Sequence, residues 1–317
     1  MGAISFRLDF MIDLRRLQVL RAFADYGTVT ATAAALHLTP SAVSQQLKTL
    51  ASDLGVDLLR HEGRLVHLTP AARTLLHHAD TLQAQWQRAQ PDLAAEGRES
   101  VGPLRLCGVP SAVAALAAPA TRRLAVAHPR LQVEIREEES ADCYRLIGAE
   151  EADVGIVLPS PDAPAVVDPR FEQYQLLDDP QDLLVPADHP LARLEGVALS
   201  AAATEEWIVK KENNDTYALL VSACLAAGFA PGITHQVKEW YTVSALVAEG
   251  FGVCLLPRMV PIPSSHAVVR VPLREGPIPT RRIMTCIRRG SAGHPNIAAG
   301  LGALSDIATA FRTLTGG

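Results

Sequence analysis

The sequence predicts an α/β protein in which a short helical N-terminal part precedes a larger part of alternating strands and helices. Three observations support this prediction. The first is a pair of short helices followed by a hairpin pattern within residues 28–68. The second is an apolar heptad repeat after residue 70, which is typical of one long helix. The third is the strand–helix alternation that begins near residue 103 and is typical of doubly wound lobes.

The stretch TVTATAAALHLTPSAVSQQLKTL predicts two helices joined by a tight corner, a helix-turn-helix. Thr39 suits an N-cap, and Pro40 suits the first helical position because its missing N–H would be unpaired there. Helical spacing places an apolar set on the inner face: Val43, Leu47 and Leu50. The opposite face carries side chains that can contact bases or phosphates in the major groove: Ser41, Ser44, Gln45 and Lys48. The alternative is an ordinary helical hairpin whose polar face is solvated.

The segments on either side extend this pattern. A helix is expected from Leu14 to Asp25, ended by Gly27 and packed beneath the pair. After the second helix, RHEGRLVHL predicts a hairpin with Gly63 at its tip, and such a hairpin would form a wing. Arg64 on this wing is a candidate contact for the DNA backbone or minor groove, although arginines on a hairpin more often serve only solubility.

The second Thr-Pro pair, at residues 69–70, predicts the start of a helix about 30 Å long. Its apolar residues alternate at intervals of three and four: Ala72, Leu75, Ala79, Leu82, Trp86, Ala89 and Leu93. Pro91 is expected to end or kink the helix near Gln90. An apolar seam of this length needs a partner, and a second copy of the chain is the simplest one. We therefore expect Leu75, Leu82 and Trp86 to form a dimer contact.

Composition limits the function classes. A net charge of −5 over 317 residues argues against a protein that coats nucleic acid non-specifically, but it allows a small DNA-reading domain. No apolar run reaches membrane-spanning length, and no signal segment is recognisable, so we expect a cytoplasmic protein without membrane contact. Five scattered cysteines without a CxxC pair predict reduced thiols and neither a metal site nor a cofactor. Residues 1–10 precede a second methionine and are expected to be a leader.

The motifs LHLTPSAVSQQLKTLASDLGV and GRLVHLTPAA resemble the winged helix-turn-helix and linker helix of LysR-type transcriptional regulators. The rest of the chain resembles the effector domain of that family. The resemblance implies DNA reading through the first two turns of the second helix, which here carry Pro40, Ser41, Ser44 and Gln45, with Arg64 on the wing. Many members have arginine where this chain has Gln45, and glutamine favours adenine over guanine in bidentate readout.

The larger part is expected to form two lobes. LRLCGVP, LQVEIRE and ADVGIVLP predict three strands of a first lobe, and Phe171 to Leu177 predicts a crossing strand. WIVKK, ITHQVKE and GVCLLP predict strands of a second lobe, and TRRIMTCIRR predicts the return crossing. Two crossings give a clamp like that of periplasmic small-molecule-binding proteins. The expected boundaries are 11–70 for the DNA-binding domain, 71–100 for the linker helix and hinge, 101–176 with 267–317 for effector lobe I, and 177–266 for effector lobe II.

Three helix starts at strand ends are candidate effector contacts, because helix N-termini present free N–H groups. They contain Ser111 and Ala112 in the first, Asn214, Asp215 and Thr216 in the second, and Glu239, Trp240 and Thr242 in the third. Some of these residues can equally be caps or core. Acids near the cleft favour an amine or hydroxyl-rich ligand, and the aromatic side chains permit a ring. We expect an amino acid or amino-bearing aromatic ahead of a dicarboxylate.

The resulting hypothesis is a small-molecule-responsive transcriptional regulator that binds double-stranded DNA as a dimer or tetramer. An enzyme is disfavoured because the sequence lacks a GxSxG elbow, an HExxH motif, a P-loop and a GxGxxG fingerprint. Two alternatives stay open: a solute-binding protein, which leaves the first ninety residues unexplained, and a redox-sensing regulator of the same family. A redox sensor needs two thiols that meet on oxidation, and the loop from Lys210 to Tyr217 has no cysteine.

Overall fold

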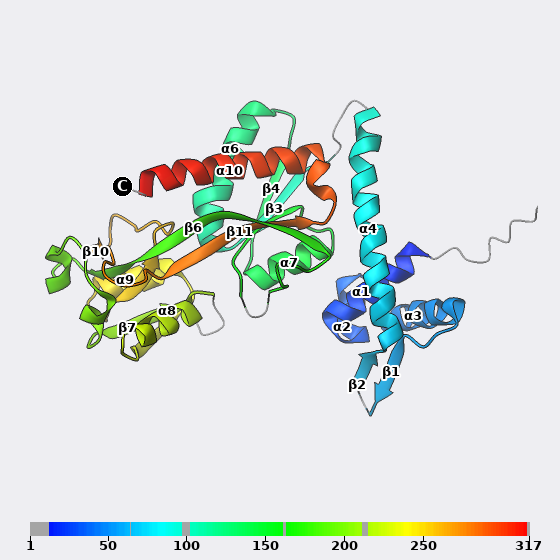
Figure 1. Cartoon of the computed structure of the whole chain (residues 1–317), viewed down its shortest axis with the longest axis horizontal. Coiled ribbons are helices and arrows are strands. Elements are labelled where there is room, and N and C mark those ends of the chain that lie inside the picture. Colours follow the sequence, from blue (N-terminus) through cyan, green and yellow to red (C-terminus); the bar gives the residue numbers. More distant parts are fainter. Residues whose placement is uncertain (1–12, 64, 97–101, 161–162, 211–214, 316–317) are drawn as a thin grey trace, which may run out of the picture. The chain divides into compact units, whose positions relative to one another are not determined.

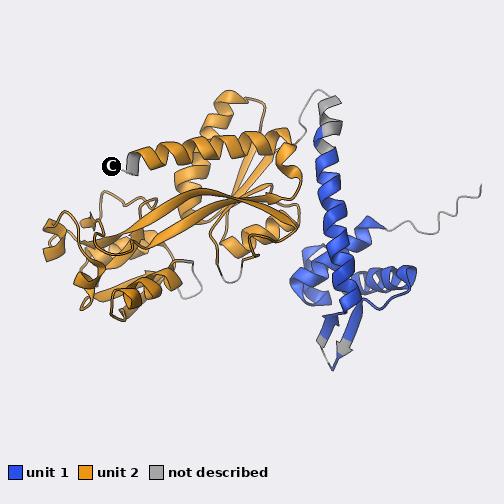
Figure 2. Ribbon diagram, in the orientation of Figure 1, with its two compact units in different colours: residues 1–92 blue, residues 93–317 orange. Residues whose placement is uncertain are grey.

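The structure is a computed structural model that describes residues 13–63, 65–96, 102–160, 163–210 and 215–315. The chain divides into two compact units, residues 1–92 and 93–317 (Figure 2). The expected leader, residues 1–10, lies outside the described residues. None of the described helices combines the length and the apolar character needed to cross a membrane.

Three helices form the core of the first unit: α1 Leu14–Tyr26, α2 Val29–Ala35 and α3 Pro40–Leu54 (Figure 1). Each begins at a side-chain cap, because Asp13, Thr28 and Thr39 accept a backbone N–H from the first turn. Gly27 ends α1 at a φ of 72°, a left-handed conformation that glycine adopts without strain. The helix pair and the helix beneath it are confirmed.

The predicted wing is an antiparallel hairpin of β1 Leu59–Glu62 and β2 Leu65–Leu68. Gly63 at its tip has a φ of 63°. Thr69 anchors the hairpin to the next helix, since its hydroxyl donates to the Asp57 carbonyl at 2.7 Å and accepts from the Ala72 N–H at 3.1 Å. The Thr-Pro helix start is therefore also confirmed.

The long helix α4 runs from Pro70 to Glu96, so it does not end near Gln90, and the other expectation, a kink at Pro91, stays a prediction. Pro91 removes one helical hydrogen bond, that to the Gln87 carbonyl, and the helix continues past it. The apolar seam serves two purposes. Leu75 packs against the core of its own unit. In contrast, Leu82 and Trp86 are 48% and 52% exposed. Leu82 and Trp86 are thus open to a partner, and the dimer contact at the partly buried Leu75 stays a prediction.

The first lobe of the second unit is built on parallel strands with β3 in the middle: β3 Leu104–Gly108, β4 Val133–Glu137 and β5 Val154–Val157. Its main helices are α6 Ala118–Ala127, α7 Ser140–Gly148 and α10 Pro295–Thr315 (Figure 1). The helix expected near residues 111–128 begins as α5, Pro110–Ala112, and passes through a π-helical turn, Val113–Ala117, before α6. The π turn ends two residues before Pro119, which lacks the N–H of a regular helix.

Two long antiparallel strands, β6 Phe171–Pro186 and β11 Thr280–Arg288, lie side by side and join the lobes (Figure 1). The sequence predicted a crossing strand that ends at Leu177, and this end is wrong. The polar run DDPQD looks like a break, but it continues the strand because Asp179 and Asp182 are buried and paired with arginines.

The second lobe contains four further strands and two helices: β7 Glu206–Lys210, β8 Gly232–Val237, β9 Cys254–Pro257, β10 Val268–Val271, α8 Asp215–Ala226 and α9 Trp240–Ala248. Short 3-10 turns lie at Pro190–Arg193, Leu199–Ala202 and Ser291–Gly293. The predicted return to lobe I at residue 267 is too early. β10 pairs with the lobe II end of β6, and Val271 packs with Trp207 in the lobe II core, so the return occurs along β11.

Candidate functional sites

Helix α3 presents an exposed polar face. Its apolar residues Val43, Leu47 and Leu50 are buried in the core of the first unit, as the helical spacing predicts. Ser44 is half-buried, and the other predicted reading residues are exposed: Thr39, Pro40, Ser41, Gln45 and Lys48. The structure therefore brings all six to one end and face of α3.

Local hydrogen bonds orient these side chains. The Thr39 hydroxyl accepts from the Ala42 N–H at 3.1 Å and lies 3.0 Å from the Ser41 hydroxyl. The Gln45 side-chain amide donates to the Thr49 hydroxyl at 3.3 Å. All of these contacts are exposed to water, so bases or phosphates can replace them at small cost.

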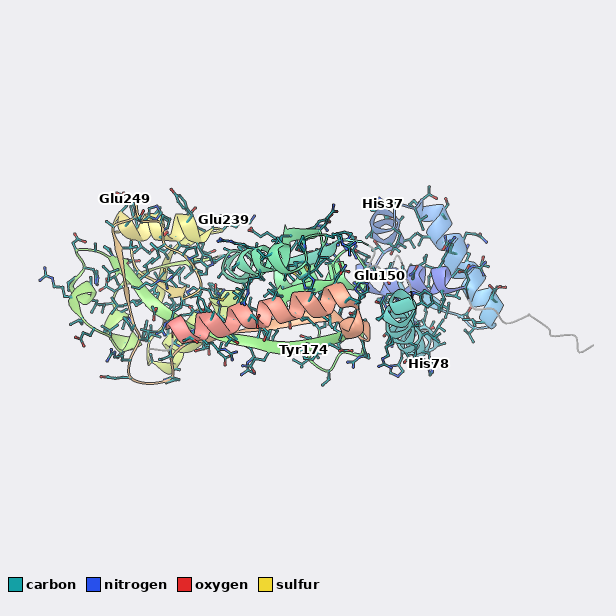
Figure 3. The ribbon with its side chains drawn as sticks, turned by 90° about the horizontal axis from the view of Figure 1, so that it is seen from above. His37, His78, Glu150, Tyr174, Glu239 and Glu249 are labelled. Atoms are coloured by element: carbon teal, nitrogen blue, oxygen red, sulfur yellow. The ribbon has the colours of Figure 1, made fainter. Side chains whose placement is uncertain are left out.

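The corner and the wing flank this face. His37 forms the corner between α2 and α3 at a φ of 52°, a left-handed conformation that the sequence reasoning did not anticipate (Figure 3). On the wing, Arg60 pairs with Glu62 at 2.5 Å, and both side chains are mostly exposed. Such a pair contributes little stability, so Arg60 can exchange its partner for a phosphate. Arg64, the predicted wing contact, lies outside the described residues.

A second candidate site is a hollow between the two lobes, beside the crossing strands. It is lined by residues from both lobes and from β11: Val109, Pro110, Ser111, Glu139, Leu158, Lys210, Thr216, Trp240 and Arg281. Its empty volume is about 230 Å³, including open solvent.

The floor of the hollow is a buried ion pair. Arg281 on β11 lies 2.6 Å from the Asp179 carboxylate on β6, and the two side chains are 4% and 0% exposed. The same guanidinium donates to the Ser111 hydroxyl at 3.1 Å. The other oxygen of Asp179 accepts the Met259 N–H at 3.1 Å. This chain of contacts links the lobe I helix start to both crossing strands and to lobe II.

A second acid sits on the opposite face of β6. Burial raises the pKa of Asp182, and the attraction of Arg258, 3.0 Å away, offsets only part of that rise. Arg270 lies farther from the same carboxylate, at 3.9 Å. The Asp179 pair thus joins β6 to β11, whereas Asp182 pairs with Arg258 and with Arg270 of β10.

Lys210 provides the positive charge on the lobe II side. It ends β7, its side chain is only 5% exposed, and its ammonium lies 5.4 Å from the centre of the Trp240 ring. This distance permits a cation–π interaction. The Lys210 ammonium also lies 3.9 Å from a carboxylate oxygen of Glu139, which belongs to lobe I.

The structure brings together three of the predicted effector contacts, Ser111, Thr216 and Trp240. Ala112 is fully buried beside them. Glu239 and Thr242 are exposed and do not line the hollow, and Figure 3 shows Glu239 at the opposite end of α9 from Glu249. Helical geometry explains this correction, because the start of α9 turns only Trp240 inward. Asn214 lies outside the described residues, and Asp215 is described only as the first backbone residue of α8.

Sequence reasoning missed Lys210, Arg281 and Glu139, although each stands at a strand end or a helix start. The described lining carries Lys210, Arg281 and Glu139, but Arg281 is already paired with Asp179. The expected preference for an amine relied on Glu239 and Asp215; Glu239 does not line the hollow, and the preference itself stays a prediction. Among the described residues, no cluster of His, Cys, Asp or Glu is arranged to hold a metal ion.

All five cysteines are free and buried. Cys107, Cys143 and Cys286 share one apolar cluster of lobe I, and the Cys107 thiol lies 3.9 Å from the Cys143 carbonyl. A hydrogen bond with Cys107 and burial raise the pKa of Cys143 well above its ordinary value. Burial likewise raises the pKa of Cys254 to about 12. Cys143 and Cys254 therefore stay protonated near neutral pH and react slowly with oxidants.

Two family models match the chain. The model of the bacterial regulatory helix-turn-helix protein, lysR family, matches residues 14–73, and that of the LysR substrate binding domain matches residues 97–307. A hydrogen peroxide-inducible genes activator from Dickeya chrysanthemi is 25% identical over 288 residues, which cover 88% of this chain and 90% of the relative. The regulator AlsR from Bacillus subtilis is 29% identical over 248 residues, or 78% and 80% of the two chains.

Solved structures of full-length regulators share the fold. A full-length OxyR variant from Pseudomonas aeruginosa superposes with a TM-score of 0.65 at 21% identity, covering 94% of this chain and 95% of that one. CbnR, solved in complex with its target DNA, gives a TM-score of 0.54 at 20% identity, covering 94% and 100%. At these identities the likeness concerns the fold.

Proposed function

The chain belongs to the LysR family of bacterial transcriptional regulators, and we propose that it responds to a small anionic effector, such as a carboxylate, bound in the hollow between its lobes. As a member of this family it binds double-stranded DNA, takes a small-molecule effector in its second unit and forms oligomers. The proposal concerns the chemical class of the effector and the residues that contact it.

The observation that carries this proposal is the placement of the buried Lys210 ammonium beside the hydroxyls of Ser111 and Thr216. Arg281 is paired with Asp179 and donates to the Ser111 hydroxyl. A carboxylate can accept hydrogen bonds from the ammonium and both hydroxyls at once. Trp240 offers an aromatic face to the rest of the ligand, so an aromatic or short aliphatic carboxylate fits best.

We assign DNA reading to the exposed face of α3. Ser44 and Gln45 are the base-reading candidates because their side chains both donate and accept hydrogen bonds, while Lys48 suits a phosphate. The wing residue Arg64 is retained as a backbone contact on the strength of the motif alone. CbnR was solved with its target DNA, which supports the same use of the first unit here.

We assign the dimer contact to Leu82 and Trp86 on α4, which are exposed within one chain. Exposing the Leu82 and Trp86 side chains to water is costly. A second α4 that packs alongside would cover both of them. A tetramer formed from two such dimers is the proposed assembly on DNA.

A peroxide-sensing role is the second candidate, because a hydrogen peroxide-inducible activator is among the relatives. The cysteines argue against it. Peroxide reacts with accessible thiolates, whereas Cys107, Cys143 and Cys286 are buried and the pKa values of Cys143 and Cys286 are raised by their surroundings. The solute-binding alternative does not account for a DNA-binding first unit.

Gel shifts with the DNA that flanks the gene test the proposed effector class. The full-length chain should bind a specific fragment, and a panel of small carboxylates should contain one that changes its affinity or mobility. The matched amides of those carboxylates serve as neutral controls. If an amine or an uncharged compound is the effector and every carboxylate is inert, the proposed class is wrong. If hydrogen peroxide alone changes binding, the redox role replaces it.

A further inference from the structure

We propose that Glu139 acts as a built-in substitute for the anionic group of the effector: its carboxylate pairs with Lys210 across the hollow and favours the closed arrangement of the two lobes until an effector anion replaces it. This inference rests on the proposed function, because it assumes that an anion binds beside Lys210. It adds a mechanism of lobe closure and a reason for selectivity between anions and neutral molecules.

Lys210 is a buried cation that needs negative charge nearby. Its side chain is 5% exposed, and a buried ammonium is costly unless negative charge or hydrogen-bond acceptors surround it. The Trp240 ring meets part of this need from within lobe II. The Glu139 carboxylate, 3.9 Å away, brings a full negative charge from the other lobe.

Glu139 stands at the start of α7, within reach of Lys210. It occupies the N-cap position of α7, yet its side chain does not cap that helix and lies near Lys210 instead. Its backbone is held firmly, since the adjacent Ser140 hydroxyl accepts the Leu158 N–H at 3.0 Å and fixes the start of α7 to the end of β5. A fixed backbone with a side chain turned across the hollow is the geometry of a reversible bridge.

An effector carboxylate can replace Glu139 as the partner of Lys210. The Glu139 side chain is 47% exposed, so it can return to water at little cost, whereas Lys210 cannot. A long, half-exposed ion pair is weak, which makes it replaceable. An effector carboxylate that binds Lys210 therefore displaces Glu139 and breaks the bridge between the lobes. A neutral ligand offers Lys210 no charge and leaves the bridge in place.

The test compares Glu139→Gln with Glu137→Gln, a matched change at an exposed glutamate on β4 that does not line the hollow. Benzoate and its neutral counterpart benzamide are titrated into each full-length variant by calorimetry. Glu139→Gln should bind benzoate about two- to five-fold more tightly than wild type, the range expected for losing a half-exposed competitor. Glu137→Gln should bind benzoate like wild type, and benzamide should distinguish none of the variants. Equal affinities of wild type and Glu139→Gln for benzoate would overturn the proposal.

A second measurement needs no ligand. Single cysteines introduced at Val167 in lobe I, which is 85% exposed, and at Glu249 in lobe II can carry spin labels, because the five native cysteines are buried. Labelled chain is diluted with unlabelled chain so that distances arise within one molecule. Glu139→Gln should widen the distance distribution as much as Lys210→Met does, while Glu137→Gln should not. An unchanged distribution in Glu139→Gln overturns the bridge.

The two measurements separate this inference from the proposed function. A widened distribution without benzoate binding to wild type or Glu139→Gln supports the bridge and counts against an aromatic carboxylate as effector. Benzoate binding that depends on Lys210 but not on Glu139, with unchanged distances, supports the proposed effector class and refutes the bridge.

Discussion

Removing the Asp179 carboxylate should destabilise the second unit more than any other single acid-to-alanine change on the crossing strands. Asp179→Ala leaves the Arg281 guanidinium, 4% exposed, without its partner at 2.6 Å and the Met259 N–H without its acceptor at 3.1 Å. Breaking a buried pair from one side costs about 3–5 kcal/mol. A typical domain has a total stability of about 5–15 kcal/mol, so the loss should be a large fraction.

The neighbouring pair provides a matched control. Asp178 and Arg282 lie 3.5 Å apart one position along the same two strands, but they are 49% and 59% exposed. Asp178→Ala should therefore cost no more than about 1 kcal/mol. Urea unfolding of the full-length chain, followed by circular dichroism, measures both losses through the midpoint of the transition.

A double variant completes this test. Arg281→Met should be destabilising by itself, but adding it to Asp179→Ala should cost about 1–3 kcal/mol less than the sum, because the second change removes the buried charge that the first left unpaired. Equal losses for Asp178→Ala and Asp179→Ala, or strictly additive effects in the double variant, would refute the reasoning that the buried pair holds the crossing strands.

Three further predictions concern other parts of the chain. Ser44→Ala and Gln45→Ala should each weaken specific DNA binding by about 1–3 kcal/mol per lost base contact, measured by gel shift, and equal losses on random DNA would make them backbone contacts. Leu82→Asp should dissociate dimers in light scattering, whereas intact oligomers would place the contact elsewhere. Burial lowers the pKa of His294, so its contribution to stability is present above pH about 6.5 and is lost as the pH falls through the folded pKa. His294→Asn should flatten the loss of stability below that pH, and an unchanged pH profile of the urea midpoint would contradict this.

The first unit was largely predictable from the sequence because its signals are local. The Thr39-Pro40 start, the Gly27 stop and the Gly63 tip each act within one turn of the chain, and the structure has them where they were expected. Pro91 is the exception, since the cost of a missing hydrogen bond does not by itself tell whether a helix continues.

The crossing strands and most of the hollow were less predictable because their signals are non-local. In the sequence, Asp179 looks like an acidic residue of a loop, because the arginine that neutralises it, Arg281, lies far along the chain. Lys210 and Glu139 come together only when two lobes meet. Thr216 and Trp240 were identified because helix starts at strand ends form a recognisable pattern, but that pattern did not tell which side of α9 faces inward.

Calorimetric titration of the effector found by gel shift into wild type and Lys210→Met tests the central claim most directly. The account predicts a carboxylate or another anion whose affinity falls at least about tenfold in Lys210→Met, because a buried charge-assisted hydrogen bond is lost, worth about 1.5–3 kcal/mol. An effector that binds wild type and Lys210→Met equally well would contradict the account and place the regulatory site outside the hollow.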